Sequence, residues 1–433
     1  MMELRKTTKN YKVISALLMS MIWHSVVAQV SFENYAITGA TIIDANHKTP
    51  LSNQTVLISH SQISDIFNDG SKAIPDSFSI IEIKGKYLLP GLIDSHVHMA
   101  TDPSGVDNRA HTLDVLSRML FSGITSVRDM AGDARTLASL SRDAFKADII
   151  SPDIYYSALM AGPVFFADPR TVSSSEGFAA GNAPFMKAVT DSTDIALAVA
   201  EAKGTGATGI KLYANLSASL VKKIVAEANK QNIIVWGHAW LDDARPSDIV
   251  KAGVNPVSHS PLLLYEKIDS IPASWRNGHT AYKSIGDSIP DLSSLFQSMR
   301  DHHTILDATM LAYKKFAESD TAFRYSYEIT KYITARAYKA GVTIDAGTDD
   351  DQEEFVQKEM ELMVKDAGFT PIDALIAGTL NGAKALRIDN RCGTISTGKA
   401  ADLLVLNKNP LKKIENIESV DMVIKRGKIF RKQ

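Results

Sequence analysis

From residue 88 onward, short apolar stretches alternate with longer segments in which apolar residues recur on one helix face. The predicted strands are 88–98, 124–128, 152–159, 208–214, 233–240, 254–259, 304–309 and 342–348. The predicted helices between them include 109–121, 191–203, 217–231, 246–252 and 322–340. This alternation predicts an α/β fold, a (β/α)8 barrel of the TIM type. An open doubly wound sheet is the alternative, but no glycine-rich phosphate loop follows the first strand.

Both ends of the chain instead show short strands separated by turns. Before residue 88 the predicted strands are 35–43, 55–59, 62–66 and 79–83. After the helical segments 352–366 and 371–386, strands are predicted at 393–395, 401–406 and 420–429. We therefore predict a small discontinuous β-sandwich domain from residues 29–87 plus 390–433, and a barrel domain of residues 88–389.

The stretch 163–189 is rich in Gly, Ser, Ala and Phe and has little periodicity. Long loops without secondary structure are uncommon in compact domains unless they carry function. We expect a long loop after the third barrel strand, in the position of an active-site lid.

The first 28 residues have the pattern of a secretory signal peptide. Their basic residues are Arg5, Lys6, Lys9 and Lys12. Residues 13–23 form an apolar stretch too short to span a bilayer, and Val26-Val27-Ala28 fits a small-residue cleavage site before Gln29. We expect a secreted or periplasmic protein with no membrane span after cleavage. An uncleaved N-terminal anchor is the alternative.

The composition is that of an ordinary globular protein, with 433 residues, 45% of them hydrophobic and 22% charged. The formal net charge of −2 gives no reason to expect a nucleic-acid partner. Cys392 is the single cysteine, which excludes an intramolecular disulfide and a cysteine-rich zinc site. We expect a small-molecule substrate as the partner and allow for a homo-oligomer.

Residues that can bind a metal follow several predicted strands. Alternate residues of a strand face the same side, so His96 and His98 point together from the carboxyl end of the first strand. Such a pair is common by chance, but later strands add Lys211, His238, His259 and Asp349. In a (β/α)8 barrel the carboxyl ends of all strands meet at the catalytic face, so we expect these residues to share one site.

Four imidazoles and a carboxylate suit zinc or another borderline divalent ion. Lysine does not bind a metal as an ammonium, and an unpaired ammonium on a core strand is costly. N-carboxylation would turn Lys211 into a carboxylate-like bridge between two metals, whereas a buried salt-bridged lysine is the alternative. We expect two divalent metal ions, with zinc as the first choice.

Several stretches along the chain resemble the amidohydrolase superfamily, in the branch of imidazolonepropionase-like enzymes and metal-dependent Xaa-Pro dipeptidases. The matching residues are 90–98, 123–129, 210–211, 237–239, 258–259, 347–349, 379–386 and 398–406. The resemblance implies that His96, His98 and Asp349 bind one ion. It also implies that His238 and His259 bind a second ion, and that carboxylated Lys211 bridges the two.

The chain departs from these relatives outside the proposed ligands. Many relatives carry Gly-Gly-His after the third strand, where this chain reads Met160 to Phe166. A Pro-Thr-Leu stretch is common at the seventh strand, where this chain reads Asp307-Ala308-Thr309-Met310. We expect a different substrate pocket, with an aromatic wall in place of a polar one.

Other polar residues near the predicted site have two interpretations each. Arg128 forms a structural ion pair with Asp129, or it contacts a substrate carboxylate. Tyr213 hydrogen-bonds substrate, or it packs. Glu354 and Glu359 are interpreted as ordinary acids on a helix face.

The chemistry that follows is an exported amidohydrolase that cleaves the amide or peptide bond of a small substrate, with a dipeptide as first choice. Metal-activated hydroxide attacks the carbonyl, and Asp349 passes the proton to the leaving amine. A cyclic amide or lactone hydrolase and a deaminase are alternatives on the same site. A metal-free binding protein on the same fold is the alternative from another class.

Overall fold

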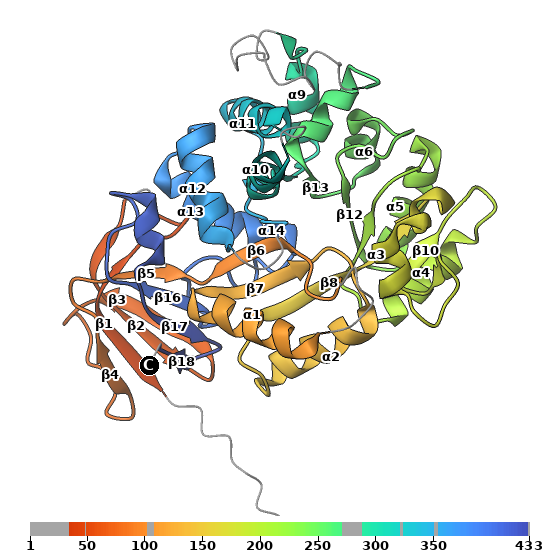
Figure 1. Cartoon of the computed structure of the whole chain (residues 1–433). Coiled ribbons are helices and arrows are strands. Elements are labelled where there is room, and N and C mark those ends of the chain that lie inside the picture. Colours follow the sequence, from red (N-terminus) through yellow and green to blue (C-terminus); the bar gives the residue numbers. More distant parts are fainter. Residues whose placement is uncertain are drawn as a thin grey trace, which may run out of the picture.

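The computed structural model describes residues 34–47, 49–101, 108–270, 288–320, 324–349 and 354–431. The predicted signal segment lies outside these residues. Figure 1 shows two parts, a barrel with surrounding helices and a separate sheet in which the red-orange beginning and the blue end of the chain lie side by side. Within the described part of the chain, no helix is both long and apolar enough to cross a membrane.

The barrel is an eight-stranded parallel structure in the order β6-β7-β8-β11-β12-β13-β14-β15. Its strands are β6 (Leu92–Val97), β7 (Ile124–Asp129), β8 (Asp153–Ala161), β11 (Gly209–Leu212), β12 (Ile234–His238), β13 (Val257–Ser258), β14 (Leu306–Asp307) and β15 (Ile344–Asp345). Two backbone hydrogen bonds close the ring, from Ser95 N–H to Ala346 O at 3.0 Å and from Asp349 N–H to His96 O at 2.8 Å. The predicted TIM-type barrel is confirmed.

The helices follow the strands as the alternation predicted. They are α1 (Arg109–Phe121), α2 (Ala134–Lys146), α3 (Pro169–Ser174), α4 (Ile195–Gly204), α5 (Ala218–Lys230), α6 (Pro246–Ala252), α9 (Ser293–Asp301), α10 (Met310–Ser319), α11 (Arg324–Lys339), α12 (Val356–Ala367), α13 (Pro371–Ile376) and α14 (Gly382–Ala385). In α5, Ser217 caps the first turn by accepting from Leu220 N–H, and residues at helical spacing from Leu220 to Ala228 are buried. The helix predicted over 371–386 is interrupted by a π-turn at Ala377–Asn381.

The second sheet is built from both chain ends in the order β18-β17-β16-β5-β1-β2-β3, with β4 paired to β1. Its strands are β1 (Tyr35–Ile42), β2 (Leu51–Ser59), β3 (Gln62–Asn68), β4 (Ser79–Glu82), β5 (Tyr87–Pro90), β16 (Leu403–Leu406), β17 (Val420–Lys425) and β18 (Lys428–Phe430). Apolar side chains from both ends, such as Ile37, Leu88 and Val405, bury one shared core. This shared core stabilises the sheet as one unit.

Three predicted strands are wrong in detail. The strand predicted over 88–98 divides at Gly91, because β5 joins the second sheet and β6 joins the barrel. A Cβ at Gly91 would lie 2.3 Å from the Thr125 side chain, so only glycine fits this crossing. Residues 393–395 form no strand, and 420–429 is a hairpin that turns at Arg426-Gly427, both with positive φ.

Candidate active site

The structure brings the six predicted metal-binding residues to the carboxyl ends of the barrel strands. Donor atoms of His96, His98 and Asp349 lie within 4.8 Å of one another. The ring of His259 lies 5.3 Å from His96 and 4.7 Å from His238. Lys211 donates from Nζ to Ser258 Oγ, on the next barrel strand but one, at 2.7 Å. The sequence-predicted cluster is therefore one connected site.

Local backbone contacts hold the first and last strand ends together. The carboxylate of Asp94 accepts from Thr348 N–H at 3.1 Å and from Thr348 Oγ1 at 2.9 Å. Asp349, the next residue, has a φ of 48° and donates its N–H to His96 O. His259 and Thr309 also have positive φ, at 77° and 52°. Strained backbone at three adjacent strand ends is typical of a functional site.

Hydrogen bonds fix which imidazole nitrogens carry a proton. His98 Nδ1 lies 3.0 Å from Ala131 O, which can only accept, so Nδ1 is the donor. His98 Nε2 then faces Asp349 Oδ1 at 3.2 Å, and His96 Nε2 faces the same oxygen at 3.4 Å. The Nε2 lone pairs of His96 and His98 both point toward the negatively charged Asp349 Oδ1. A proton or a cation is therefore required between the imidazoles and this oxygen. The donor set fits a divalent metal.

His238 and His259 are neutral imidazoles suited to the same purpose. Burial lowers the pKa of His259 to about 3 and holds the pKa of His238 well below its usual value. Thr309 Oγ1 donates to Ala308 O at 2.8 Å, so it accepts from His259 Nδ1 at 2.9 Å. His259 Nε2 is left as a free donor atom for a metal.

Asp349 is ionised in this surrounding. Burial on its own would raise the pKa of Asp349, but the imidazoles of His96, His98 and His259 outweigh burial and hold it well below its usual range. Lys211 shows the opposite response, because burial lowers its pKa to about 7. At neutral pH a large share of Lys211 is the neutral amine, which is the nucleophilic form.

No role was predicted for Asp307 from the sequence, although residues 307–310 differ from the Pro-Thr-Leu stretch common at this strand. Asp307 is fully buried, and its Oδ2 lies 2.6 Å from His96 Nδ1 and 2.9 Å from Ser258 Oγ. A carboxylate at the carboxyl end of a short apolar strand was the available signal.

Glu359 is not an ordinary helix-face acid. It is fully buried and accepts from Met310 N–H at 2.9 Å and Leu311 N–H at 2.7 Å. These bonds cap the start of α10, immediately after Thr309. Glu359 thereby supports the backbone that carries the partner of His259.

The geometry favours the structural interpretation of Arg128. Its side chain is fully buried, and Nε donates to Ser95 O at 2.5 Å. Its guanidinium lies 3.8 Å from Asp307 and 3.9 Å from Asp345, and it also stacks over Trp236. Its ion pairs are therefore with these two aspartates, whereas Asp129 accepts from the N–H groups of Met99 and Ala131.

Tyr213 forms part of an aromatic wall. Its hydroxyl donates to Met130 O at 2.8 Å, and its ring lies 4.5 Å from His238 and 5.0 Å from Phe165. Phe165 comes from the segment 163–189, which is more ordered than the predicted loop. That segment contains a 3-10 turn (Pro163–Ala167), α3, and the strands β9 (Asn182–Ala183) and β10 (Met186–Ala188), and β10 pairs with β8.

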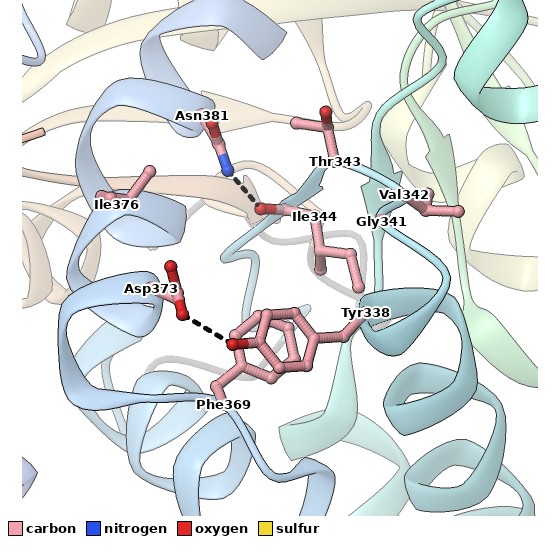
Figure 2. A pocket seen from close by; sticks show the side chains of 9 residues that line it. All are labelled: Tyr338, Gly341, Val342, Thr343, Ile344, Phe369, Asp373, Ile376 and Asn381. Atoms are coloured by element: carbon pink, nitrogen blue, oxygen red, sulfur yellow. Dashed lines mark hydrogen bonds between the residues drawn. The ribbon is translucent and has the colours of Figure 1, made fainter.

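A separate cavity of about 210 Å³ lies at the amino end of β15. Figure 2 shows Tyr338 donating to Asp373, and the Asn381 amide donating to Ile344 O. Among the described residues, its lining includes none of the predicted site residues. We therefore place the chemistry at the opposite end of the barrel.

The barrel, with imidazole, amine and carboxylate groups at its carboxyl end, places the protein in the class of (β/α)8-barrel proteins with a polar site at that end. More specifically, the chain belongs to the amidohydrolase family, whose model matches residues 87–430. It is an enzyme, a hydrolase that acts on carbon–nitrogen bonds.

Known relatives cover most of the chain. Ochratoxinase of Aspergillus niger is 25% identical over 459 residues, covering 94% of this chain and 88% of that protein. The 5'-deoxyadenosine deaminase of Methanothermobacter thermautotrophicus is 23% identical over 413 residues, covering 87% and 85%. The crystal structure of an Xaa-Pro dipeptidase with bound methionine in its active site has a TM-score of 0.74 at 23% identity, covering 92% of this chain and 100% of that one. This structural similarity confirms the fold.

Proposed function

We propose that the chain is an exported, binuclear metal-dependent amidohydrolase that cleaves the amide or peptide bond of a small substrate. The observation that carries this proposal is the convergence of donor atoms from His96, His98 and Asp349 within 4.8 Å. Two neutral imidazoles, His238 and His259, lie beside this cluster. Five or six donors are more than one tetrahedral ion uses, which favours two ions.

Lys211 supplies the bridge in this proposal. Its neutral amine attacks carbon dioxide, a C–N bond forms, one amine proton leaves to solvent, and the product is a carbamate. The remaining carbamate N–H keeps the hydrogen bond that Lys211 makes to Ser258 Oγ. His96, His98 and Asp349 would hold one ion, His238 and His259 would hold the other, and the Lys211 carbamate would supply a ligand to each.

When bound at these positions, divalent ions, zinc by first choice, would supply an acidified water molecule and a polarised substrate carbonyl. Asp349 is ionised, because the neighbouring imidazoles keep its pKa low. Its carboxylate therefore accepts the proton of the attacking water and delivers it to the leaving nitrogen. Burial holds the pKa values of His238 and His259 low, so these two imidazoles do not compete for this proton.

The substrate class follows from the wall beside the site. The ring of Tyr213 lies 4.5 Å from His238 and the ring of Tyr313 lies 6.1 Å from His259, and Phe165 extends this wall from Tyr213 at 5.0 Å. Such a wall favours an apolar or aromatic side chain next to the scissile bond. A dipeptide or N-acyl amino acid with such a side chain is our first choice, in keeping with the names of the ochratoxinase and dipeptidase relatives.

A deaminase is the second candidate, and the deaminase relative favours it. Both reactions use the same attack at a carbon that bears nitrogen. Only the leaving group differs, ammonia in one case and an amino acid in the other.

A substrate screen tests the proposal. The metal-loaded protein is incubated with dipeptides, N-acyl amino acids and aminopurines, and the amine released is identified by mass spectrometry. We expect turnover of amides with aromatic side chains and none by Asp349→Asn. Release of ammonia from aminopurines alone would replace the first candidate by the second, and turnover of neither class would contradict both. N-terminal sequencing of exported protein tests the predicted start at Gln29.

A further inference from the structure

One buried carboxylate links two of the proposed metal-binding residues. Asp307 Oδ2 lies 2.6 Å from His96 Nδ1 and accepts from Ser258 Oγ at 2.9 Å. Ser258 Oγ in turn accepts from Lys211 Nζ at 2.7 Å. All four side chains are at most 1% exposed. Asp307 Oδ2 therefore connects His96 on β6, directly, with Lys211 on β11, through Ser258.

The barrel is shaped to allow this contact. Ser258 and Asp307 are direct register partners on β13 and β14, so their side chains start side by side. Two residues after β15, a Cβ at Gly347 would lie 2.5 Å from Asp307 Oδ1 and 2.6 Å from His96 Cβ. Any larger residue at Gly347 would push the carboxylate away from the imidazole. Arg128, 3.8 Å from Asp307 Oδ2, supplies a positive charge on another side.

The contact determines the direction of each hydrogen bond. An ionised carboxylate only accepts, so His96 donates from Nδ1 and leaves the lone pair of Nε2 toward Asp349. Ser258 donates its only hydroxyl proton to Asp307, so its oxygen can only accept the hydrogen bond from Lys211. An amine and a carbamate nitrogen both have an N–H to give, and the same bond orients both.

We propose that Asp307 is a positioning residue that fixes the tautomer of His96 and, through Ser258, the orientation of Lys211. It would thereby preorganise an imidazole ligand and the bridging group with one charge. This inference rests on the proposed function, since it assumes that the site takes metal ions.

The test compares two buried aspartates that share Arg128. Zinc affinity of the full-length protein is measured by competition with a chromophoric chelator for Asp307→Asn and for the matched control Asp345→Asn. Asp345 lies 3.9 Å from Arg128, and neither of its oxygens has a hydrogen-bond partner among the described residues. We expect Asp307→Asn to lose about 10- to 100-fold in zinc affinity and the control to change by less than about threefold. Unchanged affinity in Asp307→Asn, or an equal loss in both variants, would overturn the proposal.

Two further measurements keep the proposal testable if Asp307→Asn does not fold. Ser258→Ala removes only the link to Lys211, and we expect a lower carbamate content, read from the carbamate carbon resonance after labelling with ¹³CO₂. Imidazole ¹⁵N resonances of the unaltered protein, assigned with His96→Gln, should show a protonated Nδ1 at His96. An unprotonated Nδ1, or full carbamate content in Ser258→Ala, would contradict the positioning role. Failure of the unaltered protein to bind zinc would instead contradict the proposed function, and the Nδ1 resonance would still decide the tautomer.

Discussion

Two buried aspartates of this molecule, Asp153 and Asp307, have very different surroundings. Asp153 lies where the barrel meets the second sheet, and three cations contact it: Lys425 at 2.8 Å, Arg426 at 2.6 Å and Arg391 at 2.9 Å. These cations outweigh burial and lower the pKa of Asp153. The cluster joins the two parts of the protein by paired charges.

Inside the barrel, by contrast, the buried carboxylates outnumber the cations near them. The buried carboxylates Asp94, Asp307 and Asp345 share the charge of Arg128, and Lys211, whose pKa burial lowers to about 7, adds only a partial positive charge. Asp307 Oδ1 and both oxygens of Asp345 have no hydrogen-bond partner among the described residues. A region optimised for stability would pair these groups, whereas an excess of acceptors at the strand ends suits a site that takes cations. The paired charges around Asp153 therefore stabilise the interface between the barrel and the second sheet, whereas the groups at the carboxyl end of the barrel are suited to chemistry.

The largest effect is expected when the barrel end loses Asp349. Asp349→Asn keeps the shape of the side chain but cannot accept the proton, so kcat should fall on the order of 10⁴-fold. Steady-state kinetics on a substrate found in the screen measures this. Turnover is compared per folded molecule, and activity within tenfold of the unaltered protein would remove Asp349 from the mechanism.

The second prediction concerns Lys211. Lys211→Ala should lower kcat on the order of 10³-fold, because this variant cannot form the proposed bridging carbamate. Short carboxylic acids added to this variant should restore part of the activity by occupying the same space. Full activity without any added acid would refute the bridge.

A substitution at the interface between the barrel and the second sheet should change the stability of the protein and not its catalysis. Asp153→Asn leaves three cations around a neutral side chain, so we expect a loss of about 3–5 kcal/mol in the free energy of unfolding, measured with urea. Asp421→Asn is the control, because its partly exposed pair with Lys86 should contribute less than about 1 kcal/mol. Turnover per folded molecule should be unchanged in both. A catalytic defect in Asp153→Asn would break the distinction between the two regions.

The last prediction is a change in the pH dependence of stability. Burial, followed by the charge of Asp307, raises the pKa of Asp345 to about 8. The folded protein then binds this proton more tightly than the unfolded chain does, so stability is lost as pH rises from about 4 toward 8, by at most about 1.4 kcal/mol per pH unit. Asp345→Asn cannot lose a proton, so its advantage over the unaltered metal-free protein should grow from pH 5 to pH 8. A constant difference across this range would contradict the raised pKa.

Much of the barrel could be predicted from the sequence, and so could the grouping of the six proposed ligands at its carboxyl end, because both depend on local patterns. Strand and helix periodicity set the alternation, and the histidines stand directly at strand ends. His96 and His98 needed only the two-residue repeat of a strand to be placed together.

The rest depends on tertiary contacts that leave a weak local signal. Gly91 divides one apolar run between two sheets because Thr125 crowds it from another strand. Asp307 and Glu359 act on partners far away in the chain, so their roles appear only once β6, β13 and α10 are in place. Arg128 could be placed near the site, but its partners Asp307 and Asp345 could not.

The central claim is that the barrel end binds two divalent ions through these residues. Elemental analysis of the purified protein after reconstitution with zinc tests it most directly. We predict about two equivalents of metal per chain, falling to about one in Lys211→Ala. Less than about half an equivalent, with no activity restored by added zinc or manganese, would contradict the account.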